Sequence, residues 1–159
     1  MGNLQDEIKK KILKEEQKLD EPKNKEEQGV IQFYKDGVLN SDLVSSNAKE
    51  WADKFYPNPD KKSDKRNLTS AQIRKFYGEV LSIEEKLKTL KDFNLVKPQI
   101  LMLKSKAAYA ANPNNRKIPD SFRDWIFDMV DSIKDEKDFK AFKLTFEAIV
   151  GYFYGKGAK

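Results

Sequence analysis

The sequence predicts an all-α protein: a compact bundle of about five antiparallel helices, preceded by a poorly ordered or extended N-terminal segment. Three observations support this prediction. Apolar residues recur at spacings of three and four through most of residues 41–155, which is the period of an amphipathic helix. The joints between these stretches are short and rich in helix-capping residues and proline. The chain has 159 residues, which suits one domain with a real core.

Residues 1–28 form a charged N-terminal extension with nearly balanced charges and few apolar positions. We expect a marginal, solvated helix that ends before Pro22, followed by a disordered linker. Residues 29–40 contain an Asp-Gly pair typical of tight turns, and they are consistent with either an extended arm or a short hairpin. The helical bundle domain is expected over residues 41–155, and residues 156–159 are expected to be a frayed tail.

The first two bundle helices have distinct start signals. The first is expected over residues 42–56, with Ser41 as its N-cap. Its expected apolar face comprises Val44, Ala48, Trp51 and Phe55. The second has the stronger signal, because Thr69 and Gln72 make a capping box. Its apolar stripe comprises Ile73, Phe76, Val80, Ile83, Leu87 and Leu90.

Gly78 lies opposite this stripe, on the exposed face expected for the second helix. Glycine in a helix interior costs about 1 kcal/mol relative to alanine. Two explanations fit the position: a partner packs closely against it, or a side chain from elsewhere in the chain needs the room.

The remaining helices are also marked by caps and apolar spacing. The third is expected to begin within residues 94–98 and to end near Ala111, where an Asn-Pro pair follows. It has little polar surface, which predicts a central position in the bundle. Its apolar residues are Leu95, Val96, Ile100, Leu101, Met102, Leu103, Ala107, Ala108 and Ala110. The fourth is expected from Asp120, acting as its cap, to about Lys134, and the fifth directly after Asp135. Their expected buried residues are Phe122, Trp125, Ile126, Met129, Ile133, Phe139, Phe142, Phe146, Ile149 and Phe153.

The composition excludes several classes of function. The chain contains no Cys and no His, which removes thiol nucleophiles, imidazole acid-base catalysis and the usual zinc sites. It also has no glycine-rich phosphate loop. We therefore expect no enzymatic activity and no cofactor. No apolar run approaches the length of a membrane span, and the N-terminus lacks the apolar core of a signal peptide, so a cytoplasmic protein is expected.

The charge is unevenly distributed along the chain. The net charge is +5 overall, but residues 60–75 carry +4, residues 93–119 carry +5 and residues 120–138 carry −4. The second block contains no Asp or Glu at all. Two basic blocks followed by an acidic one suit both a polyanion and a neighbouring subunit.

The basic blocks supply the candidate residues for nucleic-acid binding. Phosphates require positive charge spread over a surface, and bases stack on exposed aromatic faces. The candidates are Lys65, Arg66, Arg74, Lys75, Lys104, Lys106, Tyr109 and Arg116. No sequence-reading motif is present, so any binding is expected to involve the backbone. The alternative explanation is that these lysines are solvated, as on any helical surface.

The acidic block places Asp124, Asp128 and Asp131 on one face of the fourth helix, at spacings of four and three. Such carboxylates can hold a divalent ion. Surface acids at helical spacing more often face solvent or a partner, and we expect this face to contact a neighbouring subunit.

Two stretches, LTSAQIRKFY (residues 68–77) and LKSKAAYA (residues 103–110), resemble the signature segments of the small helical subunit of the type III-A CRISPR effector, the Csm complex. The similarity covers roughly residues 35–155. It implies a non-catalytic subunit of an antiviral ribonucleoprotein, with several copies stacking along the groove that holds CRISPR RNA paired with target RNA. It also implies RNA-phosphate contacts by Arg74, Lys75, Lys104, Lys106 and Arg116.

Two other kinds of function remain open at the level of sequence. One is a free-standing DNA-binding regulator that uses the second or third helix for recognition. The other is a helical adaptor that binds only protein, with its basic blocks meeting acidic partners.

Overall fold

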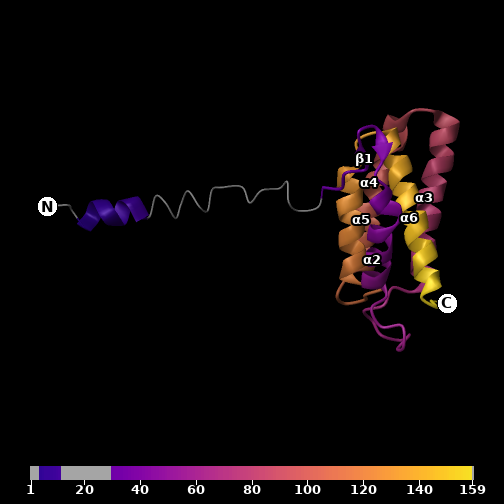
Figure 1. Cartoon of the computed structure of the whole chain (residues 1–159), viewed down its shortest axis with the longest axis horizontal. Helices are drawn as coiled ribbons and strands as arrows, with labels where there is room; N and C mark the ends of the chain where they lie inside the picture. The colour runs from indigo at the N-terminus through magenta and orange to yellow at the C-terminus, as the bar shows by residue number, and fades with distance from the viewer. Residues whose placement is uncertain (1–3, 12–29, 159) are drawn as a thin grey trace. The chain divides into compact units, whose positions relative to one another are not determined.

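The computed structural model describes residues 4–11 and 30–158, and the chain divides into two units, Met1–Val30 and Ile31–Lys159 (Figure 1). In the first unit, residues 4–11 are helical and have exposed side chains. The end expected for this helix and the expected linker lie outside the described residues.

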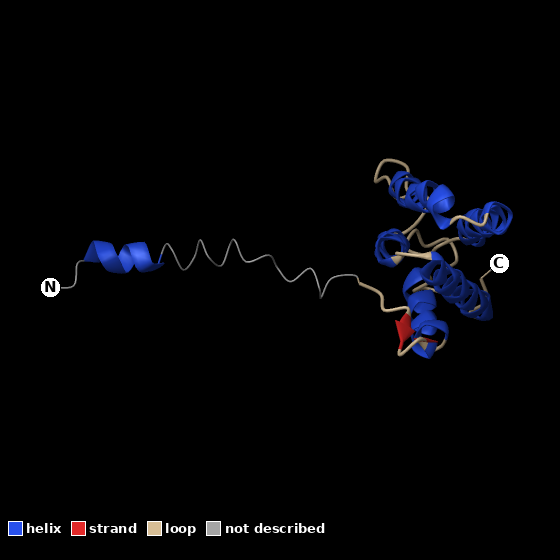
Figure 2. Cartoon of the chain, turned by 90° about the horizontal axis from the view of Figure 1, so that it is seen from above, coloured by secondary structure: helices blue, strands red, loops and turns tan. Residues whose placement is uncertain are grey.

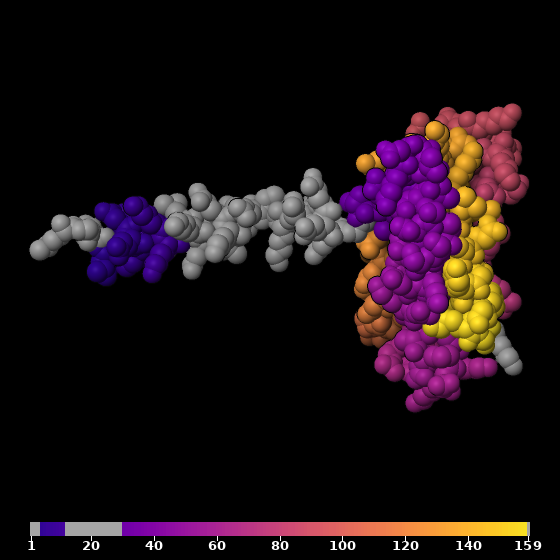
Figure 3. Space-filling view, viewed as in Figure 1, coloured from indigo at the N-terminus to yellow at the C-terminus, as the bar shows by residue number. Residues whose placement is uncertain are grey.

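The second unit confirms the predicted all-α bundle. Its elements are β1 (Tyr34–Lys35), β2 (Val38–Leu39), the 3-10 helix η1 (Ser41–Val44), α2 (Ser46–Phe55), α3 (Ser70–Leu90), α4 (Phe93–Ala110), α5 (Asp120–Ser132) and α6 (Glu136–Gly155). Figure 2 looks nearly along the axes of the helices. Helix α2 packs against α6, and α4 packs against both α3 and α5. The face seen in Figure 3 is formed by the hairpin, α2 and α6.

The segment before the bundle is a hairpin rather than an extended arm. Tyr34 pairs with Leu39 in antiparallel register, and the turn uses Asp36 and Gly37 with φ of 52° and 78°. Positive φ at both central residues is the geometry of a type I′ turn. The hairpin is tied to the first turn of α6, because the Tyr34 hydroxyl donates to the carbonyl of Lys137 over 2.8 Å.

The prediction of one continuous first helix capped by Ser41 is wrong. Asn40 is the cap, its side chain accepting the backbone amide of Asp42 over 3.3 Å, and its carbonyl accepts the Leu43 amide over 3.1 Å, which closes the 3-10 turn. Ser45, with φ −128° and ψ −101°, then interrupts the helical path before α2 begins. The buried residues of the two segments are Leu43, Ala48, Ala52 and Phe55.

Helix α3 follows its prediction closely. Thr69 Oγ1 accepts the backbone amide of Gln72 over 3.2 Å, which satisfies one of the free donors at the helix start. The predicted stripe is buried as far as Leu87, whereas Leu90 at the last position is half exposed. The helix ends where Lys91 adopts the left-handed conformation, with φ of 55°.

The prediction that the third helix is central is wrong. Helix α4 packs against α3 and α5 and buries only one side, comprising Val96, Ile100, Leu103, Ala107 and Ala110. Four of its large side chains are about half exposed or more: Leu95, Leu101, Met102 and Tyr109. Apolar content alone did not reveal this, because burial of a helix depends on how many neighbours surround it.

Helices α5 and α6 complete the core, with two corrections at their ends. Asp120 is not the cap of α5: Pro119 occupies that position, and Asp120 lies in the first turn. Asp135 does cap α6, accepting the amide of Asp138 over 2.9 Å. The tail is not frayed where it is described, since Lys156 Nζ lies 2.7 Å from an Asp53 carboxylate oxygen on α2 and Ala158 is buried. The buried faces of both helices are as predicted.

Gly78→Ala should increase stability. A Cβ at this exposed position would meet no atom within 4 Å, so no described side chain needs the room. We expect the free energy of unfolding to rise by about 0.5–1 kcal/mol, measured by urea denaturation. Gly37→Ala is the opposing control, because its positive φ of 78° strains any other residue. A loss of stability for Gly78→Ala comparable with that of Gly37→Ala would contradict the prediction.

Candidate nucleic-acid interface

A groove of about 360 Å³ lies between α3 and α4 near the start of α3. It is lined by Gln72, Lys75, Phe76, Glu79, Ser105, Lys106, Tyr109, Ala110 and Lys117. Its floor is partly apolar, because Phe76 and Ala110 belong to the core, whereas its rim carries lysines and the 74% exposed Tyr109. Three of the predicted binding residues, Lys75, Lys106 and Tyr109, therefore meet in one place.

The groove continues along the same two helices into a second hollow of about 270 Å³. Glu79 and Lys106 line both hollows, and the second adds Lys86 and Met102. Lys106 Nζ lies 2.7 Å from Glu79 Oε2, so one ion pair links α3 to α4 across the groove where the two hollows meet. We call the two hollows together the α3/α4 groove; its lining holds four lysines against one carboxylate.

Sequence reasoning missed Lys86, and it counted Lys117 in the second basic block without selecting it as a binding residue. Lys86 had a usable signal: Lys75, Glu79 and Lys86 are spaced by four and seven residues, so they fall on one side of a helix. Lys117 lies in the loop after α4, and only the tertiary fold brings this loop close to α3.

A third depression, of about 520 Å³, lies at the end of the bundle where the loops after α2 and α4 meet. We call it the end hollow; it is lined by Lys54, Pro57, Lys65, Arg66, Arg116, Pro119, Asp120 and Ser121. It gathers the predicted residues Lys65, Arg66 and Arg116, which the groove does not contain. Lys54, from the last turn of α2, was not among the candidates.

The two arginines of the end hollow are held by carboxylates. Arg66 Nη2 lies 2.7 Å from Asp64 Oδ2, and the Arg66 backbone amide also donates to Asp64. These hydrogen bonds from Arg66 hold the pKa of Asp64 well below its usual range. Arg116 Nη1 lies 2.7 Å from Asp120 Oδ1. Both guanidinium groups are thus positioned at the rim before any ligand binds.

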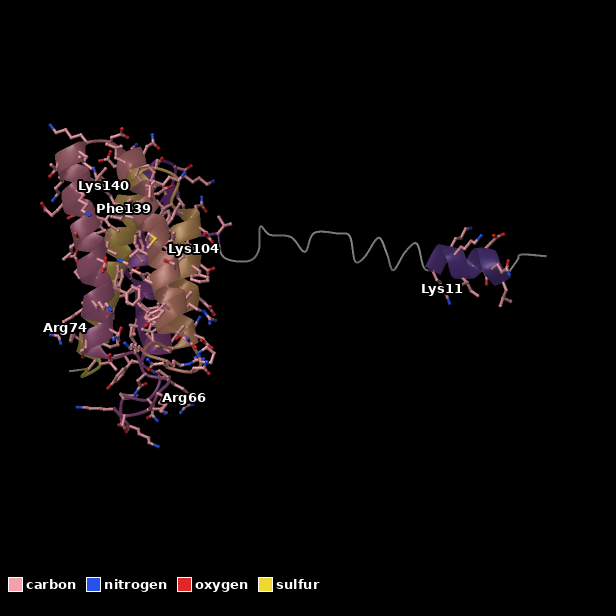
Figure 4. The ribbon with its side chains drawn as sticks, turned by 180° about the vertical axis from the view of Figure 1, so that it is seen from behind. Lys11, Arg66, Arg74, Lys104, Phe139 and Lys140 are labelled. Carbon is pink, nitrogen blue, oxygen red and sulfur yellow. The ribbon has the colours of Figure 1, made fainter. Side chains whose placement is uncertain are left out.

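Two predicted residues lie outside both sites. Lys104 faces α5, where its Nζ is 2.6 Å from Asp131 Oδ1 and 5.3 Å from the centre of the Phe127 ring. A spacing of two residues places Lys104 and Lys106 on opposite sides of α4. Figure 4 shows Lys104 beside α5 and Arg74 at the outer edge of α3.

The basic block of α4 is therefore less unbalanced than its sequence suggests. Lys104, Lys106 and Arg116 all pair with carboxylates elsewhere in the chain. Among the described residues, Lys75 and Lys117 form no ion pair, and neither does Lys65. These lysines are available to an external anion, and so is Lys86 in the groove, which forms no ion pair with another described residue.

The acidic face of α5 is exposed, as its spacing predicted. Partial burial raises the pKa of Asp128, and the negative charges of Asp124 and Asp131 raise it further. Within residues 4–11 and 30–158 no group of three side chains is arranged to hold a metal ion. Asp131 pairs with Lys104 and Asp124 pairs with Arg123, so Asp128 is the one carboxylate of the three that forms no ion pair with another described residue.

Lys104→Ala should weaken the bundle. The Lys104–Asp131 pair joins α4 to α5, and a partly exposed pair of this kind contributes about 0.5–1 kcal/mol. A double-mutant cycle with Asp131→Ala, measured by urea unfolding, should give a coupling free energy of that size. Lys97→Ala, at an exposed α4 position, is the control and should change stability by less than about 0.5 kcal/mol. Additive effects of the two substitutions would show that the pair contributes nothing.

These features define a class of protein: a small helical bundle with a basic surface groove. None of the described helices is long and apolar enough to cross a membrane. The family model Csm2 Type III-A matches residues 39–157, so the chain belongs to the Csm2 family and is a small subunit of the type III-A Csm complex of CRISPR systems. The match leaves out the N-terminal unit. Searches of curated proteins and of solved structures gave no match.

Proposed function

We propose that this chain is a non-catalytic, RNA-binding structural subunit of the Csm complex. Several copies stack along the groove that holds CRISPR RNA and target RNA, in the cytoplasm, and each copy contacts the phosphate backbone without reading sequence. The observation that carries the proposal is the α3/α4 groove, in which four lysines surround one carboxylate beside an exposed tyrosine.

The chemistry of the groove suits a nucleic-acid backbone. Lysine is a flexible point charge that neutralises phosphates wherever they lie, and four lysines spread over two helices match a chain of phosphates better than a single small anion. Tyr109 offers a flat face for a base, and such stacking tolerates any sequence. Lys75 and Lys117, which form no ion pair in the described part of the chain, are the proposed primary contacts.

The proposal assigns no reaction to the chain. The sequence lacks Cys and His, and the carboxylates of α5 lie on a convex, exposed helix face rather than in a pocket. We propose that Asp124, Asp128 and Asp131 contact a neighbouring subunit, where a basic partner surface would offset their mutual repulsion.

Salt titration of RNA binding tests the proposed function. A fluorescently labelled oligouridine is bound to the protein over a range of salt concentrations. Three to four phosphate contacts predict a slope of log K against log salt of about −2 to −3. Equal affinity for unrelated RNA sequences is expected. A slope near zero would overturn the proposal and favour an adaptor that binds only protein, whereas a sequence-specific footprint on duplex DNA would favour a regulator.

Glu79→Gln should strengthen RNA binding. The Glu79 carboxylate forms an ion pair with Lys106, and its negative charge repels phosphates. Removing this charge leaves the Lys106 ammonium group free to bind a phosphate. We expect affinity to rise about three- to fivefold, which corresponds to about 0.6–1 kcal/mol. Glu85→Gln, at an exposed α3 position paired with Lys88, is the matched control and should have little effect. Unchanged or weaker binding by Glu79→Gln would contradict this role.

A further inference from the structure

Two consecutive residues of the loop between α4 and α5 line different depressions. Lys117 lines the α3/α4 groove, whereas Arg116 lines the end hollow. The loop therefore forms a ridge between the two basic surfaces, with one cation directed to each side. Among the residues that line the two sites, no other two that are adjacent in sequence lie one in each site.

The ridge is held by local hydrogen bonds. Asn112 accepts the backbone amide of Asn114 with its side chain over 2.9 Å, and the Lys117 amide donates to the Ala110 carbonyl over 2.7 Å. The next residue, Ile118, is buried and 1% exposed. The backbone between the two depressions is thus anchored at both ends, so the fold fixes the backbone positions from which both cationic side chains project.

The end hollow has its own free positive charge. Among the described residues, Lys54 and Lys65 form no ion pair, although the two arginines beside them do. The hollow lies at the last turn of α2 and the first turn of α5, and Figure 4 shows Arg66 in the loop at this end of the bundle. A ligand that occupies both sites must therefore turn from the side of the bundle onto its end.

We propose that the end hollow is a second RNA site, continuous with the α3/α4 groove across the 112–117 ridge, and that the two together bind one single strand. The inference rests on the proposed function and extends it to Lys54. A flexible single strand can follow the turn, whereas a duplex resists bending over so short a distance because its persistence length is about 150 base pairs. Lys54 and Lys65 hold the strand on the end side, and Lys75 and Lys117 hold it on the groove side.

Binding of oligouridines of two lengths to the full chain tests this arrangement. The short probe has about 6 nucleotides, enough for one site, and the long probe has about 20. Lys54→Ala with Lys65→Ala should weaken binding of the long probe about tenfold and change binding of the short probe less than twofold. Lys75→Ala with Lys117→Ala should weaken both. Lys49→Ala with Lys97→Ala, exposed lysines outside both sites, should weaken neither.

The outcomes separate this inference from the proposed function. Suppose that Lys75→Ala with Lys117→Ala weakens binding of both probes. If Lys54→Ala with Lys65→Ala then weakens binding of neither probe, or of both probes equally, the proposed continuous site is wrong, whereas RNA binding in the α3/α4 groove is retained. If the unaltered protein binds neither probe, both the proposed RNA-binding function and the proposed second RNA site are wrong. A duplex RNA of about 20 base pairs should be insensitive to the end-hollow variant, and a tenfold loss with that duplex would also overturn the single-strand assignment.

Discussion

Replacing Lys75 and Lys117 together by alanine is expected to weaken binding of single-stranded RNA about tenfold, or about 1.4 kcal/mol. Both side chains line the α3/α4 groove, and neither forms an ion pair in the described part of the chain. Each contact between an exposed ammonium and a phosphate contributes about 0.5–1 kcal/mol. Fluorescence anisotropy at fixed salt measures the change in affinity.

The same variant should also change the salt dependence of binding. Loss of two phosphate contacts on a single strand reduces the magnitude of the slope of log K against log salt by about 1.4. Lys49→Ala with Lys97→Ala removes the same charge from positions outside the groove and should leave the slope nearly unchanged. If both double variants lose the same affinity, net charge rather than the groove governs binding, and the site assignment fails.

Phe122→Ala is expected to lower the free energy of unfolding by about 3–5 kcal/mol. The Phe122 ring is fully buried and lies between helices: its centroid is 5.2 Å from that of Phe55 on α2, 5.3 Å from Phe76 on α3 and 6.1 Å from Phe146 on α6. Alanine would leave a cavity among these rings as well as lose their contacts. The expected loss is a large part of the stability of about 5–15 kcal/mol typical of a domain.

Urea denaturation followed by far-UV circular dichroism measures this effect. Leu144→Ala removes a large side chain that is 43% exposed on α6 and should change stability by less than about 0.5 kcal/mol. A loss below about 1 kcal/mol for Phe122→Ala would show that the aromatic cluster does not hold the four helices together.

Local signals predicted local structure well. The Thr69 cap and the apolar stripe of α3 depend on residues three or four apart, so the sequence was sufficient to place them. Helix α4 shows the limit of the same reasoning. Its apolar content predicted a central helix, but Leu95 and Met102 are exposed, because burial depends on where the neighbouring helices lie, which spacing within one helix does not reveal.

Charge balance was the property least visible in the sequence. Lys104 pairs with Asp131 and Lys106 pairs with Glu79, and each partner is 27 residues away in the sequence. Such pairs depend on which helices become neighbours. The acid-free run of residues 93–119 therefore did not distinguish Lys106, which lies in the groove, from Lys104, which joins two helices.

Ultraviolet cross-linking of single-stranded RNA to the protein, mapped by mass spectrometry, tests the central claim most directly, because it locates the bound strand. Tyr109 in the groove is 74% exposed, and Tyr152 on α6 is 40% exposed and serves as an internal control. We expect cross-links on the peptide that contains Tyr109, lost when Lys75 and Lys117 are replaced by alanine. Cross-links confined to the peptide that contains Tyr152 would contradict RNA binding in the α3/α4 groove.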